Sequence, residues 1–171
     1  MTFQTEQINY LQRLKREFLY GFLILTSMML YVHFETSSSL MKTGSLIGLL
    51  GLGLAITAHA NAKSYFYEVE IREGFLFLRG QSVNKPITVK LPISRTEIYL
   101  KSKGRGRSNN EYYIRFKHGK KSYDVNRLFN WNYLTLVDLF HEFKKQKGEK
   151  IIWDEKYLIE FMEKKSKRMF N

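Results

Sequence analysis

The sequence contains no cysteine, which excludes disulfide bonds, thiolate metal sites, iron–sulfur clusters and cysteine nucleophiles. It is also short of acidic residues: 16 Asp and Glu stand against 28 Lys and Arg, giving the 171 residues a formal net charge of +12. A chain this basic is attracted to polyanions, such as nucleic acid or an anionic membrane surface, or to an acidic protein. Its length suits one ordinary domain, or a smaller domain with a membrane anchor.

Two stretches near the N-terminus lack Lys, Arg, Asp and Glu altogether. They are FLYGFLILTSMMLYVHF, residues 18–34, and TGSLIGLLGLGLAITAHA, residues 43–60. Each lies near the lower limit for crossing a membrane, where about 20 apolar residues are typical. A soluble helical hairpin is the alternative, but a soluble helix normally has a polar face. We therefore predict a transmembrane helical hairpin over residues 18–62, after an amphipathic N-terminal helix over residues 1–17.

The cations that flank the two spans predict their orientation. Arg13, Lys15 and Arg16 precede the first span, whereas the connecting loop offers only Lys42 against Glu35. The positive-inside rule then places both termini in the cytoplasm.

Small residues recur every three or four positions along the second span, at Gly44, Gly48, Gly51 and Ala55. That spacing puts them on one helical face and lets another helix approach closely. The face is either an interface with another copy or partner, or the surface that packs against the protein's own first span. We favour the second interpretation.

From residue 65 the apolar residues alternate, as they do in strands. YFYEVEIR is followed by Glu73-Gly74, a hairpin turn signal, and then by further short apolar runs separated by turn residues. This pattern predicts about six strands in an antiparallel meander within a domain over residues 63–150.

Two amphipathic helices follow the predicted strands. The first contains WNYLTLVDLFHEFKK, with Asn130 as a plausible N-cap and Gly148 beyond its end. The second belongs to a helical extension over residues 151–171 and begins with Asp154 as its cap. The expected fold class is α+β: a transmembrane hairpin, then a six-strand meander closed by an amphipathic helix, then one further helix.

This order of elements resembles the small bacterial membrane proteins that carry a pleckstrin-homology-like domain. The resemblance rests on YEVEIREGFLFLRG, ITVKLPISRTEIYL, YYIRFKHGKKSYDV and WNYLTLVDLFHEFKK. It implies a bacterial inner-membrane protein with a domain that binds or acts as a scaffold. The helix at 154–168 departs from the minimal pattern of that family.

Catalytic and metal-binding patterns are missing from the sequence. The four histidines, His33, His59, His118 and His141, do not have the clustered spacing that a metal site needs. The sequence also lacks a nucleophile elbow, a phosphate-binding loop and a paired set of catalytic acids. We therefore predict no enzyme activity, no metal and no cofactor.

A basic cluster occupies residues 101–127, where nine Lys and Arg stand against Glu111 and Asp124. In a meander, the 101–110 loop and the 118–121 turn lie at opposite ends of one strand, so the cluster divides into two patches. Such cations bind anionic lipid or an acidic partner, or simply face solvent. The candidate lipid- or partner-binding residues are Lys101, Lys103, Arg105, Arg107, Lys117, Lys120 and Lys121.

These patterns predict a non-catalytic accessory or assembly protein of the inner membrane, a scaffold that binds a protein partner or an anionic lipid surface. The alternative is a membrane-anchored protein that binds nucleic acid through residues 101–121. In that case Tyr112 and Tyr113 would stack on bases, as aromatic rings do in single-strand binders. No nucleic-acid-binding motif accompanies them, so a nucleic-acid partner is not expected.

Overall fold

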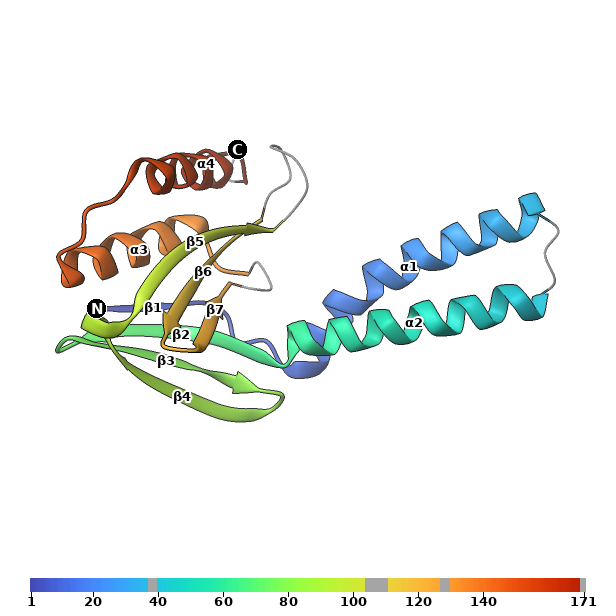
Figure 1. Ribbon diagram of the computed structural model, residues 1–171, viewed down its shortest axis with the longest axis horizontal. Helices are drawn as coiled ribbons and strands as arrows, with labels where there is room; N and C mark the ends of the chain where they lie inside the picture. Colours follow the sequence, from blue (N-terminus) through green and yellow to red (C-terminus); the bar gives the residue numbers. More distant parts are fainter. Residues whose placement is uncertain (37–39, 104–110, 127–129, 170–171) are drawn as a thin grey trace. The chain divides into compact units, whose positions relative to one another are not determined.

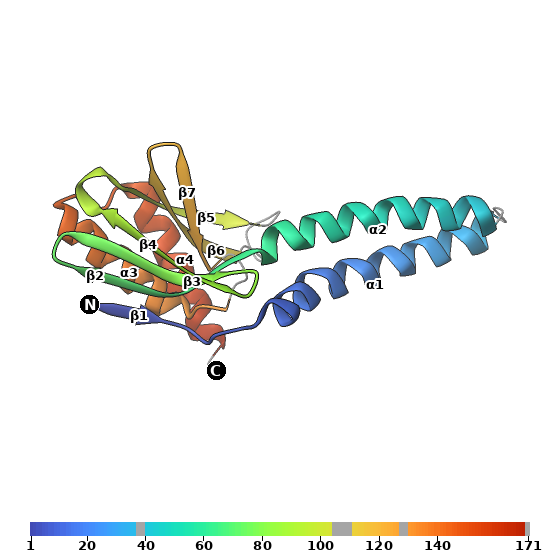
Figure 2. The same cartoon turned by 90° about the horizontal axis from the view of Figure 1, so that it is seen from below.

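The computed structural model describes residues 1–36, 40–103, 111–126 and 130–169. Within its helices, the side chains of residues 20, 29, 32–36, 40–47 and 168–169 lie outside the description. Figures 1 and 2 give two views of the chain. In chain order, its elements are β1 (Thr2–Gln4), α1 (Tyr10–Thr36), α2 (Leu40–Ala62), β2 (Ser64–Arg72), β3 (Phe75–Ser82), β4 (Lys85–Pro92), the 3₁₀ turn η1 (Ile93–Arg95), β5 (Glu97–Lys103), β6 (Glu111–His118), β7 (Lys121–Val125), α3 (Tyr133–Lys147) and α4 (Trp153–Met169).

The chain divides into two compact units. The β-sheet unit consists of Met1–Gln7 together with Tyr65–Asn171, and the hairpin unit consists of Ile8–Ser64. The hairpin unit is therefore inserted into the β-sheet unit between β1 and β2.

The hairpin unit consists of α1 and α2, which run antiparallel and contact each other. Asn9 caps α1: its side chain accepts a hydrogen bond from the amide of Gln12, whose side chain accepts one from the amide of Asn9. Farther along, the two helices meet where Gly21 lies against Leu54; a Cβ at Gly21 would come within 2.7 Å of the Leu54 side chain.

The predicted transmembrane hairpin is wrong. Over the residues that the structure describes, no helix is both long enough and apolar enough to cross a membrane. The uncharged runs are only parts of longer helices: α1 begins at Tyr10, so Arg13, Lys15, Arg16 and Glu17 belong to the same helix as the apolar residues. The assignment to the bacterial inner membrane, the cytoplasmic placement of both termini and the resemblance to small membrane proteins depended on that hairpin and are wrong with it.

The α+β fold class is confirmed, but the strands do not form one six-strand meander. They form a four-stranded sheet, ordered β1-β2-β3-β4, and a three-stranded sheet, ordered β5-β6-β7. The chain turns between them at η1, where the Thr96 amide and hydroxyl donate to the carbonyls of Ile93 and Pro92. Because this turn interrupts the ladder, β5 pairs with β6 and not with β4.

The N-terminal segment also differs from the prediction of a helix over residues 1–17. Thr2–Gln4 forms β1, which pairs antiparallel with β2 so that Phe3 lies opposite Val69. Both side chains are buried. Figure 2 shows β1 alongside the other strands of its sheet. Burial of Phe3 is the reason for the strand, because a helix in this short polar segment would have no apolar face to bury.

Helix α3 closes the core of the β-sheet unit. Its apolar face is buried against the strands, and the ring of Phe143 lies 5.4 Å from that of Phe116 in β6. Figure 1 shows α3 between α4 and the strands. Asn132, rather than the expected Asn130, caps α3 by accepting a hydrogen bond from the amide of Leu134. Gly148 ends the helix in the left-handed conformation that glycine adopts without strain.

The start of α3 is fixed by Trp131, whose side chain is buried. The indole N–H donates to the carbonyl of Phe66 in β2, at 3.1 Å, and the Trp131 amide donates to the side chain of Asn126, at 2.9 Å. The amide group of Asn126 in turn donates to the carbonyl of Tyr112 in β6. Trp131 therefore connects the two sheets at the point where the chain enters α3.

We expect Gly80→Ala to destabilise the β-sheet unit by about 3 kcal/mol, the upper part of the range for overpacking. A Cβ at this position would lie 2.1 Å from the carbonyl oxygen of Tyr65 and 2.9 Å from the Cα of Phe66, so backbone would have to move. Urea unfolding followed by the fluorescence of the buried Trp131 measures the change. Gly53→Ala is the matched control: a Cβ there meets nothing within 4 Å, and alanine favours the helix. Equal unfolding midpoints for wild type and Gly80→Ala would contradict this packing.

Candidate binding groove along strand β5

A groove of about 450 Å³ lies in the β-sheet unit between β5 and the end of α3, the connection that follows it and the start of α4. We call it the β5 groove. Its β5 residues come from both faces of the strand: Ile98 and Leu100 point into the core, whereas Glu97, Tyr99 and Lys101 point outward. The groove therefore runs along the edge of β5. The residues that line it are Glu97, Ile98, Tyr99, Leu100, Lys101, Lys144, Lys147, Glu149, Ile152, Asp154, Glu155 and Leu158.

Three outward-facing side chains of β5 form the first wall of the groove. The hydroxyl of Tyr99 donates to the carboxylate of Glu97 at 2.7 Å, and the ammonium of Lys101 lies 5.3 Å from the Tyr99 ring centre. That hydrogen bond lowers the pKa of Glu97, with a further contribution from Lys117 on β6, and raises the pKa of Tyr99. The wall therefore presents a carboxylate, a phenol and an ammonium at alternate positions.

The opposite wall is held in place by Lys144. This side chain is buried, and its ammonium contacts Glu155 at 2.9 Å and Glu149 at 3.1 Å. Burial alone would lower the pKa of Lys144, but the hydrogen bonds to the two carboxylates outweigh it and raise the pKa. Glu149 also contacts Lys147 at 2.7 Å. This network ties the end of α3 to the start of α4, which sets the position of the second wall.

The edge of β5 supplies backbone hydrogen-bonding groups to the groove. In the described part of the chain β5 has one strand neighbour, β6, so the backbone groups on its other side face away from the sheet. Apolar side chains lie beside that edge, with Ile152 exposed and Leu158 half-buried. Such an edge can accept an extended polypeptide as an additional strand.

The predicted basic residues do not gather at one place. Lys101 lines the groove. Lys103 lies opposite Glu111, the first residue of β6. Lys117 lies at the other end of β6, 3.5 Å from Glu97. Lys120 and Lys121 lie at the turn between β6 and β7, next to Lys117. Arg105 and Arg107 lie outside the described residues.

The two tyrosines expected to stack on bases lie on opposite faces of β6. Tyr112 is buried in the core, beside the ring of Tyr133. Only Tyr113 faces outward, near Arg115. Arg115 in turn forms a two-point ion pair with Asp124, with contacts of 2.6 and 2.9 Å. Tyr112 and Tyr113 therefore cannot bind consecutive bases together.

The small residues of α2 predicted to share a packing face have different surroundings where the structure describes them. A Cβ at Gly48 or Gly51 would meet nothing within 4 Å, whereas Ala55 lines a cavity between the two helices. Gly44 lies in α2, but its surroundings fall outside the described residues. Among the described residues, α1 and α2 approach closely at Gly21 of α1, a position that the sequence analysis did not single out.

Several groove residues escaped the sequence analysis. Tyr99, Glu149 and Glu155 have no local motif around them. Lys144 did leave a signal, because it falls on the apolar stripe of α3, where a cation needs a buried partner. The acidic residues that follow at 149–155 are where that partner is found.

Comparison of the chain with protein families, with curated proteins and with solved structures finds no match.

We expect Glu149→Gln to lower the free energy of unfolding by about 0.5 kcal/mol at neutral pH, since the Glu149 side chain is 40% exposed and solvent screens its ion pairs. The contact with Lys147, helped by Lys144, outweighs burial, which alone would raise the pKa of Glu149, and holds that pKa below its ordinary value of 4.5. The carboxylate therefore stabilises the fold above that value, and this contribution is lost as pH falls through the lowered pKa. Urea unfolding at a series of pH values should show that the difference in the free energy of unfolding between variant and wild type becomes smaller below pH 4.5.

The matched control is Glu142→Gln. Glu142 also lies near the end of α3, but its carboxylate accepts a hydrogen bond from the neutral side chain of Gln146. A gap between wild type and Glu149→Gln that stays constant with pH would show that the carboxylate is not stabilised by these lysines.

Proposed function

We propose that this protein is a non-catalytic binding protein whose β-sheet unit holds a partner protein in the β5 groove. An extended segment of the partner adds to the edge of β5 as a further strand. The observation that carries the proposal is the groove along a strand edge that has no second strand neighbour among the described residues.

The dimensions of the strand set the length of the bound segment. β5 has 7 residues, and antiparallel strands rise about 3.4 Å per residue, so the edge offers about 24 Å. A partner segment of about five to seven residues matches that length. Its backbone would bond to β5, and its alternate side chains would face Tyr99 on one side and Ile152 on the other.

The charges of the β5 groove favour a polypeptide over a polyanion. Three cations, Lys101, Lys144 and Lys147, line it together with four carboxylates, Glu97, Glu149, Asp154 and Glu155. An anionic lipid surface or a nucleic acid would be repelled by those carboxylates. A protein segment that carries both signs of charge can pair with both. The mutual pairing of Lys144 with Glu149 and Glu155 also favours binding over catalysis, because these groups already satisfy one another.

The nucleic-acid alternative has less support. The burial of Tyr112 removes one of its two stacking rings. Of the cations on β6, Arg115 is paired with Asp124 and Lys117 with Glu97. The remaining basic residues are divided between the two ends of the strand.

We also propose a pleckstrin-homology-like architecture for the β-sheet unit. Two antiparallel sheets, of four and three strands, with the amphipathic helix α3 packed against them support this proposal. Domains of this kind are usually binding modules, and the fold alone does not identify a partner.

Selection of peptides from a displayed random library on the intact chain tests the proposed function. We expect enriched peptides to slow hydrogen exchange at the amides of Glu97–Lys103. Ile152→Asp should weaken their binding about tenfold, which is about 1.4 kcal/mol. Ile152 is exposed, so this change should leave the fold intact.

Leu134→Asp is the matched control, because Leu134 is an exposed leucine of α3 that does not line the groove. Its peptide affinity should equal that of wild type. Peptides that bind Ile152→Asp as tightly as wild type, or that protect strands other than β5, would exclude the groove as the binding site.

A further inference from the structure

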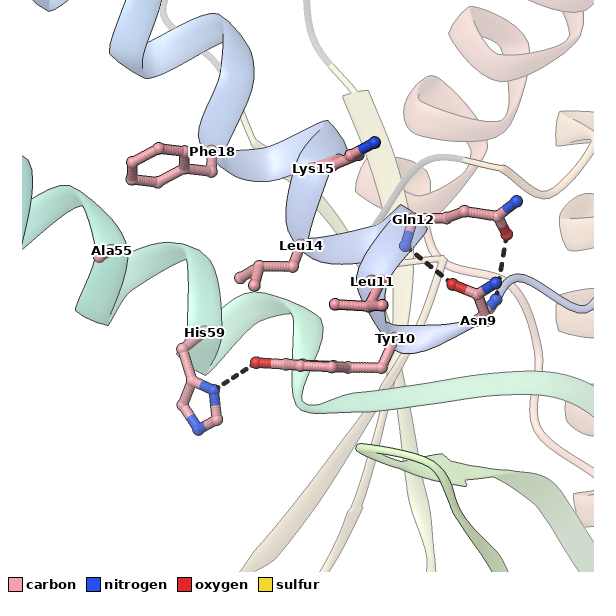
Figure 3. Close-up of a pocket in the computed structure, with 9 residues that line it drawn as sticks. All are labelled: Asn9, Tyr10, Leu11, Gln12, Leu14, Lys15, Phe18, Ala55 and His59. Atoms are coloured by element: carbon pink, nitrogen blue, oxygen red, sulfur yellow. Dashed lines mark hydrogen bonds between the residues drawn. The ribbon is translucent and has the colours of Figure 1, made fainter.

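A second cavity lies in the hairpin unit, between the first turns of α1 and the last turns of α2. Its volume is about 520 Å³, within the range of small-molecule sites. Figure 3 shows Leu11, Leu14 and Phe18 projecting from α1 toward α2, with Ala55 opposite them. The cavity also has a polar end, formed by Tyr10 and His59.

The sequence explains why the helices leave this space. Leu11, Leu14 and Phe18 follow one another at intervals of three and four, so they share one face of α1. The helices touch at Gly21 and Leu54 on one side of the cavity and at Tyr10 and His59 on the other. Between those two contacts α2 presents Ala55, whose methyl group is too small to fill the gap.

The polar end is a hydrogen-bonded pair. The hydroxyl of Tyr10 lies 2.7 Å from Nδ1 of His59, and the rings meet edge to face with centres 6.0 Å apart. A tyrosine hydroxyl both donates and accepts, and an imidazole has a second nitrogen, so this pair can bond to one more polar group. His59 and Lys15 are both exposed, and a ligand can therefore reach this end from solvent.

We infer that the cavity binds an amphiphile with a single hydrocarbon chain and a terminal carboxylate, a fatty acid in chemical class. The chain would lie along Leu11, Leu14 and Phe18, and the carboxylate would accept a hydrogen bond from the Tyr10–His59 pair. A carboxylate fits better than a neutral head group because Lys15 lines the cavity. The Lys15 ammonium points outward in Figure 3. The side chain is exposed, and its flexible four-carbon chain lets the ammonium turn toward a bound anion.

This inference is independent of the proposed function, because the cavity belongs to the hairpin unit and the β5 groove to the β-sheet unit. Failure of one leaves the other unchanged.

Titration calorimetry of the intact chain with dodecanoate, below the concentration at which it forms micelles, tests the inference. We expect saturable binding of one dodecanoate per chain. Ala55→Leu fills the space opposite Leu14 and should weaken binding at least tenfold. Thr57→Leu is its matched control: it adds a side chain of the same size on the same helix, at an exposed position that does not line the cavity, and should bind as wild type does.

A second variant tests the polar end without changing the shape of the cavity. Tyr10→Phe removes one hydroxyl, and we expect a loss of about threefold to tenfold for dodecanoate. Dodecanol should bind more weakly than dodecanoate to wild type, and Lys15→Met should reduce that difference.

Three results would overturn the inference. The first is that wild type does not bind dodecanoate. The second is that Ala55→Leu and Tyr10→Phe both bind it as wild type does, which would assign the binding to the exposed helix surface. The third result is a dimer that dissociates on Ala55→Leu in a protein that binds no dodecanoate, which would assign the cavity to a second copy of the chain.

Discussion

The hydrogen bond between the Trp131 indole and the carbonyl of Phe66 is the contact on which the β-sheet unit depends. Phe66 belongs to the four-stranded sheet, whereas Asn126, which holds the Trp131 amide, follows the last strand of the three-stranded sheet. Since both partners are buried, breaking either bond would leave a polar group without water. The sheets and the entry to α3 are therefore fixed together, and α3 has one way to cover the core.

The position of α3 in turn determines the β5 groove. Its last turn carries Lys144, a cation at a buried position that must find carboxylates after the helix ends. Glu149 and Glu155 satisfy it, and in doing so they hold α4 beside β5. Burying a cation in this way adds little stability by itself, because desolvation opposes the attraction between the charges. The ion pairs of Lys144 instead fix where α4 lies, and α4 forms part of one wall of the β5 groove.

Most of the local structure could be predicted from the sequence, but little of the long-range strand pairing could. Alternation predicted strands on either side of Glu73-Gly74, and amphipathic spacing predicted the helices that became α3 and α4. The division into two sheets was not predictable, because it depends on how Pro92 and Thr96 redirect the chain. β1 has 3 residues, too few to show alternation. The membrane prediction rested on the absence of charges and of a polar face in two runs, but among the described residues no helix is both long and apolar enough to cross a membrane. The β5 groove joins positions about fifty residues apart, and no local pattern records that juxtaposition.

The insertion of the hairpin unit between β1 and β2 has a consequence for synthesis. Phe3 leaves the ribosome before either helix, yet Val69, its partner across the sheet, emerges only after both helices have been made. Until then the first strand has no neighbour, and closing so long a loop costs conformational entropy before any contact repays it. The hairpin can form meanwhile from contacts close in sequence. We therefore expect the hairpin unit to fold before β1 pairs with β2, although β1 is made first.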